Sequence, residues 1–382
     1  MKMIIKRICV IGLALVFLAV LFSGCSKNGQ RQEQEQVQSQ ARGEKTNIVC
    51  TVFPQYDWVR NIIGDENMDS YNLTLLIDSR VDLHSYNPSV QDMAAIKTSD
   101  VFIYVGGDSD AWVGDVLRDA NPDMIAVSLV EMLGDLAVHT AYYDHDHDEG
   151  HDHDEGHDHD EGHDHDEGHD HDEDHDHDED HGHDEGHGHD DDHGHDHDHD
   201  DHADEHVWLS LRNAILLCSK LADLLSEIDP ENAQVYKNNL DIYTTRLAAL
   251  DAEYRVVVDA AVVKALVFAD RFPFRYLVDD YGLDHYAAFH GCSAETEASF
   301  ATIVSLANRV NELGLDVVMV TESADQSIAR TVIESSASRN QRILVLDSMQ
   351  SVSSSDIRSG TTYLSIMESN LIVLKEALSS SS

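Results

Sequence analysis

Basic residues are scarce in this chain, which argues against binding to nucleic acids. The 382 residues include 25 Lys and Arg against 73 Asp and Glu, which gives a formal net charge of −48 at pH 7. Proteins that bind nucleic acids neutralise phosphates with a basic surface. We therefore expect no nucleic-acid partner.

Several common sequence fingerprints are also missing. The chain contains no G-x-G-x-x-G, no G-x-x-x-x-G-K-[ST], no G-x-S-x-G and no H-E-x-x-H. None of the five cysteines forms a C-x-x-C, so a cysteine-based zinc site is not expected. Beyond the N-terminal region, Cys50, Cys218 and Cys292 allow at most one disulfide, and their pairing stays open.

One segment, residues 144–205, lacks basic residues entirely, and from 144 to 202 it contains only His, Asp, Glu and Gly. It holds 32 acidic residues and 21 of the 26 histidines, partly as copies of H-D-H-D-E-G. Without apolar side chains it cannot offset its chain entropy, so we expect a loop that is disordered without metal. Its H-x-H spacing lets neighbouring imidazoles chelate ions such as Zn²⁺, which predicts low-affinity metal sites. The first copies supply His145, His147, His151, His153, His157, His159, His163 and His165.

The N-terminus predicts export and lipid attachment. Three basic residues precede an apolar run over 8–22, which is too short to span a membrane and ends in small residues. The stretch "LFSGC" resembles a bacterial lipobox, which implies cleavage before Cys25 and lipidation of that cysteine. We predict a signal peptide over 1–24, a polar tether over 25–45 and an extracytoplasmic protein, lipid-anchored at Cys25 to the bacterial cell membrane.

Strand and helix signals alternate on both sides of the acidic loop. Short runs rich in Val, Ile and Leu predict buried strands, and the amphipathic stretches between them predict helices. Before the loop, strands are expected at 47–53, 71–77, 101–107 and 124–130, and helices at 55–65, 88–100 and 110–120. After the loop, one helix is expected over 207–229 and a long one over 230–261. Strands and helices then alternate again, beginning with a strand, at 265–270, 274–282, 284–291, 299–314, 316–323, 327–340 and 342–348. A last helix is expected at 360–379.

The long helical pattern at 230–261 indicates how the chain is organised. It runs for about 30 residues, or roughly 45 Å, which is long for a globular helix and suits a bridge between two lobes. Alternating strands and helices favour parallel sheets. We predict an α/β fold of two (β/α) lobes with mainly parallel sheets: an N-terminal lobe over 46–229 with the loop 144–205, the rigid linking helix, and a C-terminal lobe over 262–382. The cleft between the lobes is the expected ligand site.

Isolated His and Asp residues that follow predicted strands are the candidates for chemistry. His84 follows the strand at 71–77, and His206 ends the acidic loop where a helix begins. A single histidine in a loop is more often a surface residue than a ligand. The residues alone therefore leave both interpretations open.

The surroundings of these histidines resemble the zinc/manganese ABC-transporter solute-binding lipoprotein family, in particular its high-affinity zinc uptake type with a His-rich loop. "DLHSYNPSVQDM" followed by "SDVFIYVGGDSDAW" is similar to the first metal-site segment of the family. "DEHVWLSLRNA" is similar to the second, with Glu205 in place of a Pro. "NIVCTVFPQYDWVRNIIGD" and "YLSIMESNLIVLKEAL" resemble the opening strand and helix and the closing helix, so the resemblance covers 46–382.

This resemblance implies four metal ligands in the interlobe cleft, two from each lobe. His84 and His206 correspond to the first pair. The third position falls on Arg271, which is cationic and cannot ligate, so we predict the adjacent Asp270 instead. The fourth position corresponds to Asp347, after the last strand.

The C-terminal assignments keep alternatives. His285 and His290 are further candidates for the third ligand, and either aspartate would also suit helix capping or a turn. Glu322 matches an acidic family position near the site. We expect its carboxylate to accept a hydrogen bond from a ligand and not to bind the metal itself, because ligating imidazoles normally donate their second N–H to an oxygen.

Zinc is the predicted metal, with manganese as the alternative. A set of two imidazoles and two carboxylates suits Zn²⁺ and also Mn²⁺. The repeat decides between them, because Zn²⁺ binds imidazole well and Mn²⁺ lies at the weak end of the affinity order.

These features predict a monomeric metal-binding component of an ABC importer that captures Zn²⁺ and delivers it to a permease, with the repeat as a low-affinity collector. Four protein ligands would leave no open position for a catalytic water, so no enzyme is expected. The alternatives are a manganese-specific member of the same family, a surface metal buffer or adhesin, and a metallohydrolase with a vacant coordination position.

Overall fold

The computed structural model describes residues 45–78, 81–138, 203–289 and 298–379. The predicted signal peptide and nearly all of the tether and acidic loop lie outside the described residues, as do His290 and Cys292. The described residues belong to one compact unit.

The first lobe is built on a parallel sheet of four strands in the order β2-β1-β3-β4. The strands are β1 (Thr46–Cys50), β2 (Tyr71–Leu75), β3 (Val101–Tyr104) and β4 (Ile125–Ser128). The helices between and after them are α3 (Phe53–Ile63), α4 (Val90–Lys97), α5 (Val113–Arg118) and α6 (Leu129–Leu133). Ile48 of β1 pairs with both Leu73 and Val101, so β1 is a central strand, and its apolar residues are buried as the sheet is covered by helices.

The second lobe repeats this architecture with the strand order β6-β5-β7-β8, again all parallel. Its strands are β5 (Ala265–Phe268), β6 (Asp284–Ala287), β7 (Val317–Thr321) and β8 (Arg342–Leu346). Its helices are α9 (Arg275–Tyr281), α10 (Phe300–Leu313), α11 (Ser327–Ser335) and α12 (Ser354–Arg358). Short 3₁₀ turns complete the described chain at η1 (Met68–Ser70), η2 (Leu83–Ser85), η3 (Asp108–Asp110), η4 (Gly134–Leu136) and η5 (Val207–Leu209).

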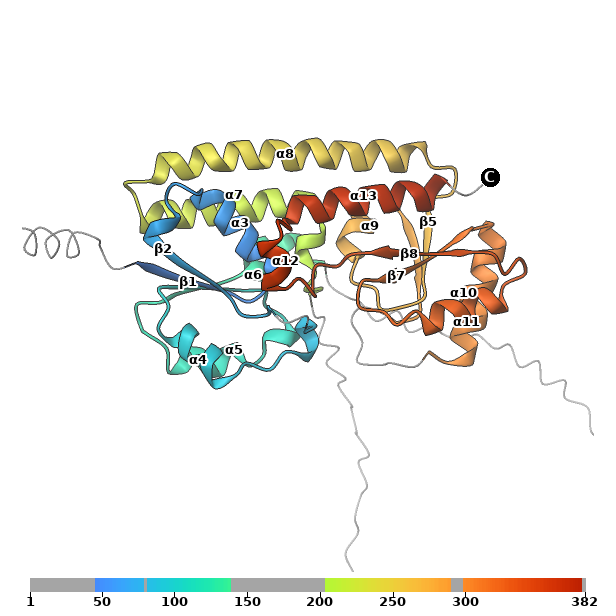
Figure 1. The fold of residues 1–382 in the computed structure, drawn as a ribbon, viewed down its shortest axis with the longest axis horizontal. Coiled ribbons are helices and arrows are strands. Elements are labelled where there is room, and N and C mark those ends of the chain that lie inside the picture. The colour runs from blue at the N-terminus through green and yellow to red at the C-terminus, as the bar shows by residue number, and fades with distance from the viewer. Residues whose placement is uncertain (1–44, 79–80, 139–202, 290–297, 380–382) are drawn as a thin grey trace, which may run out of the picture. The chain divides into compact units, whose positions relative to one another are not determined.

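Three long helices complete the described fold: α7 (Leu211–Ile228), α8 (Ala233–Ala260) and α13 (Tyr363–Ser379). Helix α8 has 28 residues, about 42 Å at 1.5 Å per residue, and it packs against α7, α3 and α13 (Figure 1). Its buried side chains recur every three or four residues or at multiples of that spacing, which places them on one face: Tyr236, Tyr243, Leu247, Leu250, Tyr254 and Val258. One cluster of buried side chains includes residues of both lobes and these helices, so the two sheets share a continuous core.

Buried hydrogen bonds tie the segment after the acidic loop to the C-terminal part of the chain. The indole N–H of Trp208 donates to the carbonyl of Ser348 at 2.9 Å, and the hydroxyl of Tyr363 donates to the carbonyl of Trp208 at 2.6 Å. The backbone N–H of Tyr363 donates to Asp57 Oδ2 at 3.1 Å, which brings helix α3 into the same network. Since Trp208 is two residues from His206, this network fixes the segment that carries the candidate ligand.

The predicted fold class is confirmed: two mainly parallel α/β lobes are present, and α8 falls within the stretch predicted as the linking helix. The strands are shorter than predicted because the chain turns at their carboxyl ends. Gly106 and Gly107, with φ of 91° and 90°, follow the end of β3, within the stretch expected to be strand. Cys50 and Cys218 are buried free thiols, so no disulfide joins them. Among the described residues, no helix combines the length and apolar character that crossing a membrane requires.

The Tyr363 hydroxyl offers a test of this packing. Tyr363→Phe would leave the buried Trp208 carbonyl without its donor, and we expect the free energy of unfolding to fall by about 1–2 kcal/mol in urea denaturation. Tyr56→Phe is the control, because no hydrogen bond of the Tyr56 hydroxyl is found within the described chain. Equal stability of the two variants would contradict a structural role for this bond.

Candidate metal centre

His84 is carried by the 3₁₀ turn η2, which follows β2 at the carboxyl edge of the first sheet. Asp82 caps this turn, since its Oδ1 accepts the backbone N–H of His84 at 2.9 Å. Leu83 is 1% exposed and anchors the turn in the core. The side chain of His84 remains 23% exposed, so it is accessible to a ligand.

His206 is held more tightly than His84. It precedes η5, whose three residues Val207, Trp208 and Leu209 are fully buried, and it is itself 2% exposed. Asp204 Oδ1 accepts the backbone N–H of His206 at 2.9 Å and lies 2.8 Å from its Nδ1. One carboxylate therefore fixes both the backbone and the ring of this residue.

The structure brings His84 and His206 together through their Nε2 atoms, which lie 3.3 Å apart. The two rings are tilted by 45°, with centroids 5.3 Å apart. Two nitrogen ligands of a tetrahedral zinc ion, at about 2.0–2.1 Å from the metal, are separated by roughly 3.3–3.4 Å. The 3.3 Å between the two Nε2 atoms therefore suits two ligands on one tetrahedral zinc ion, and without a metal it also permits a hydrogen bond between the rings when one of them carries its proton on Nε2.

The electrostatic surroundings keep the His84 imidazole neutral. Burial, and then the charge of a protonated His206, lower the pKa of His84 to about 4. A neutral imidazole retains the lone pair that a metal needs. Burial also raises the pKa of the nearby Glu205 carboxyl, and it raises the pKa of Asp110 to about 6.

The carboxylates of the second lobe line the carboxyl edge of its sheet. Asp270 follows β5, and its Oδ2 accepts the backbone N–H of Thr321 at 3.0 Å and also the Thr321 hydroxyl. Asp347 follows β8, and its Oδ1 accepts the backbone N–H of Met349 at 2.7 Å. Burial, and then the charge of Glu322, raise the pKa of Asp347 to about 6.

Glu322 stabilises the loop that carries Asp347 through hydrogen bonds. Its carboxylate accepts the backbone N–H of Ser348 at 2.8 Å, the Ser348 hydroxyl at 2.9 Å and the Ser351 hydroxyl at 3.1 Å. The side chain thus acts on the residues directly after Asp347. No contact between Glu322 and either imidazole is found in the described part of the chain.

The carboxylates of the second lobe are not gathered around the imidazole pair. Within the described ranges, no group of three or more His, Cys, Asp or Glu side chains is arranged to hold a metal ion. Arg271 instead reaches the first lobe, where its Nη1 donates to Asp82 Oδ2 at 3.1 Å. Because Asp82 caps the turn of His84, this ion pair links the second lobe to the first candidate ligand.

Of the two alternative third ligands, only His285 lies within the described residues. His285 lies on β6, and its ring stacks on Phe272 with centroids 4.1 Å apart. His290 lies outside the described residues.

An aspartate stands two residues before each candidate histidine, and no role was predicted for it. The sequences Asp82-Leu83-His84 and Asp204-Glu205-His206 both read D-x-H, and in both the aspartate accepts the backbone N–H of the histidine at 2.9 Å. The D-x-H pattern, repeated at both candidate ligands, is the sequence signal from which these two aspartates could have been predicted.

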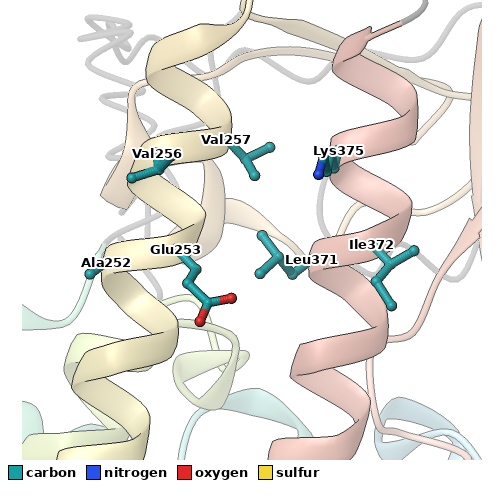
Figure 2. Close-up of a pocket in the computed structure, with 7 residues that line it drawn as sticks. All are labelled: Ala252, Glu253, Val256, Val257, Leu371, Ile372 and Lys375. Carbon is teal, nitrogen blue, oxygen red and sulfur yellow. The ribbon is translucent and has the colours of Figure 1, made fainter.

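A groove elsewhere on the unit has a different character. It lies between α8 and α13, has a volume of about 450 Å³ and contains Val257 and Leu371 between the helices (Figure 2). The other residues that line it are Ala252, Glu253, Val256, Ile372 and Lys375. With one carboxylate among mainly apolar side chains, it is not suited to bind a metal ion.

The fold and the site define a class: a two-lobed α/β protein with a histidine pair at the carboxyl edge of one sheet. The family model of ZnuA, described as "Zinc-uptake complex component A periplasmic", matches residues 48–377, and the chain belongs to this family of metal-binding solute-binding proteins.

Curated relatives agree with this assignment. The zinc-binding lipoprotein AdcA of Streptococcus pneumoniae serotype 4 is 30% identical over 370 residues, which cover 96% of this chain and 60% of that protein. The chain thus spans about 60% of the length of this relative. The high-affinity zinc uptake system protein ZnuA of Bacillus subtilis strain 168 is 25% identical over 342 residues, covering 88% of this chain and 89% of that protein.

Solved structures show the same fold. The Zn(II)-bound ZnuA-like domain of Streptococcus pneumoniae AdcA has a TM-score of 0.60 and 25% identity, covering 87% of this chain and 99% of that domain. The metal-dependent lipoprotein YcdH of Bacillus subtilis has a TM-score of 0.62 at 23% identity, covering 87% of this chain and all of that one, which shows the fold alone.

The environment of His84 predicts an unusual titration. In metal-free protein its ring should titrate near pH 4, well below the ordinary histidine value of about 6.5. Because the unfolded chain binds this proton more tightly, the contribution of His84 to stability falls as the pH drops from about 6.5 toward 4. NMR of the imidazole C–H groups, with His84→Asn to assign the signal, checks this expectation. Titration of His84 at pH 6 or above would contradict it.

Proposed function

We propose that this protein captures Zn²⁺ outside the cytoplasmic membrane and delivers it to the permease of an ABC importer. The observation that supports this most directly is the 3.3 Å spacing of the Nε2 atoms of His84 and His206, which suits two ligands of a tetrahedral zinc ion. Membership of the ZnuA family supports the same cargo and the same kind of partner.

The proposed ligand set is His84, His206, Asp270 and Asp347. The imidazole pair would bind the ion first, because its spacing already suits zinc. The two aspartates follow β5 and β8 at one edge of the second sheet, where they would close the coordination sphere. A closed sphere of four protein ligands leaves no site for a catalytic water, so we infer that the protein is not an enzyme.

The remaining parts of the proposal rest on sequence. The lipid at Cys25 would anchor a monomeric protein to the membrane, and the tether over 25–45 would let it reach the permease. The acidic repeat would collect zinc at low affinity, because its imidazoles are mostly neutral at pH 7 and its carboxylates attract cations.

Zinc titration distinguishes binding at the proposed four-ligand site from binding by the repeat. We expect the full chain to bind one Zn²⁺ tightly and several weakly, and a variant that lacks 144–202 to keep the tight site alone. Adding His84→Ala to that variant should weaken the tight site by at least about 100-fold, because one of two preorganised ligands is lost. His285→Ala is the matched control and should leave the affinity unchanged. Loss of all tight binding with the repeat would assign the site to the repeat, and tight binding by the His84→Ala variant would exclude His84 as a ligand.

A comparison of metals tests the cargo. A ligand that binds only the native state stabilises it by about 2.7 kcal/mol at 100 times its Kd. Thermal unfolding of the variant without 144–202 should therefore shift upward with Zn²⁺ more than with equimolar Mn²⁺. A larger shift with Mn²⁺ would favour the manganese-specific alternative.

A further inference from the structure

Glu205 is a buried carboxylate beside His84 that the proposed ligand set does not use. It is 6% exposed. Its Oε1 accepts the backbone N–H of Ser109 at 2.7 Å, which fixes the side chain against η3. Its Oε2 lies 3.5 Å from His84 Nδ1 and accepts no hydrogen bond within the described residues. A buried oxygen without a donor is costly, so its position beside the imidazole calls for a physical reason.

The backbone opposite Glu205 is shaped to admit this side chain. Gly107 has a φ of 90°, and a Cβ at this position would lie 2.6 Å from Glu205 Oε1 and 2.7 Å from its Cγ. Any other residue here would both strain the backbone and displace the carboxylate. The glycine that follows β3 therefore makes room for Glu205.

The contacts of His84 Nδ1 show what the carboxylate can do. The nearest polar atom is Ser109 Oγ at 2.6 Å, and a hydroxyl can either donate to Nδ1 or accept from it. If the hydroxyl donated, the neutral ring would carry its proton on Nε2, where it could donate to His206 Nε2 at 3.3 Å and would block the metal. An ionised carboxylate can only accept, so Glu205 favours the tautomer with the proton on Nδ1.

We propose that Glu205 is a positioning residue that holds the proton of His84 on Nδ1, so that Nε2 presents its lone pair to the metal. The neighbouring Asp204 stands at the same place on the other ring, 2.8 Å from His206 Nδ1. One dipeptide, Asp204-Glu205, thus orients both imidazoles, and its buried negative charge offsets that of the incoming cation. This inference rests on the proposed function, since it assigns a role at the same metal site.

Glu205→Gln tests the role, because the amide keeps the size of the side chain. The amide oxygen would keep the Ser109 N–H, and an NH₂ group would then face Nδ1, where it would favour the wrong tautomer. We expect the Kd of the tight Zn²⁺ site, measured in the full chain by chelator competition at one equivalent of metal, to rise about 10- to 100-fold. The ¹⁵N signals of His84, assigned by their loss in His84→Ala, should change from a protonated Nδ1 to a protonated Nε2 in metal-free protein.

Further variants test whether Glu205 acts by orienting the His84 imidazole or only by filling space. Ser109→Ala removes the nearer contact of His84 but leaves the carboxylate, so its Kd should rise less than that of Glu205→Gln. Gly107→Ala should reproduce the weakened binding by displacing Glu205. Gly360→Ala is its control, because Gly360 has a similar φ of 100° with no atom within 4 Å of an added Cβ.

The outcomes are distinct. Wild-type affinity together with an unchanged His84 tautomer in Glu205→Gln would overturn the role of Glu205 while leaving zinc capture intact. A large loss in Ser109→Ala with none in Glu205→Gln would give the role to the hydroxyl instead. Absence of a tight zinc site in the wild-type chain would instead refute the proposed function itself.

Discussion

The convergence of two imidazoles on one point is the interaction on which the candidate site depends. The Nε2 atoms of His84 and His206 approach to 3.3 Å, which is useful only if their lone pairs remain free. Burial disfavours the protonated ring of His84, and carboxylates lie close to the Nδ1 atom of each ring. A pair held this way needs little reorganisation when a cation arrives, so binding does not have to overcome a large ordering cost.

The architecture supplies the rigidity that this pair requires. Parallel strands end at one edge of a sheet, and the turn of His84 follows β2 at that edge. His206 is held by a different set of contacts, because Trp208 is hydrogen-bonded to Ser348 and Tyr363 in the C-terminal part of the chain. Side chains of α8 and α13 belong to the buried cluster that both lobes share, and the Arg271–Asp82 ion pair joins the second lobe to the turn of His84. The position of each imidazole is therefore coupled to contacts far from it in sequence.

Much of the fold was predictable because its signals are local. The alternation of apolar strands and amphipathic helices over 47–130 and 265–348 follows directly from burial, and the unbroken pattern at 230–261 marks α8. The ends of strands were less predictable, since Gly106 and Gly107 look compatible with a strand until their positive φ values are seen. For the site, motif resemblance identified His84 and His206, but no local pattern shows which atoms meet.

The sequence by itself determined the class of fold, the acidic repeat and the histidines worth examining, because composition and periodicity report what each segment must bury or expose. Only the tertiary structure decided that the two rings meet through Nε2, that Asp204 and Glu205 lie behind them, and that Arg271 pairs with Asp82 rather than standing free. Those relations join residues up to 189 positions apart. They are set by packing in three dimensions, and short-range sequence patterns carry no information about such distances.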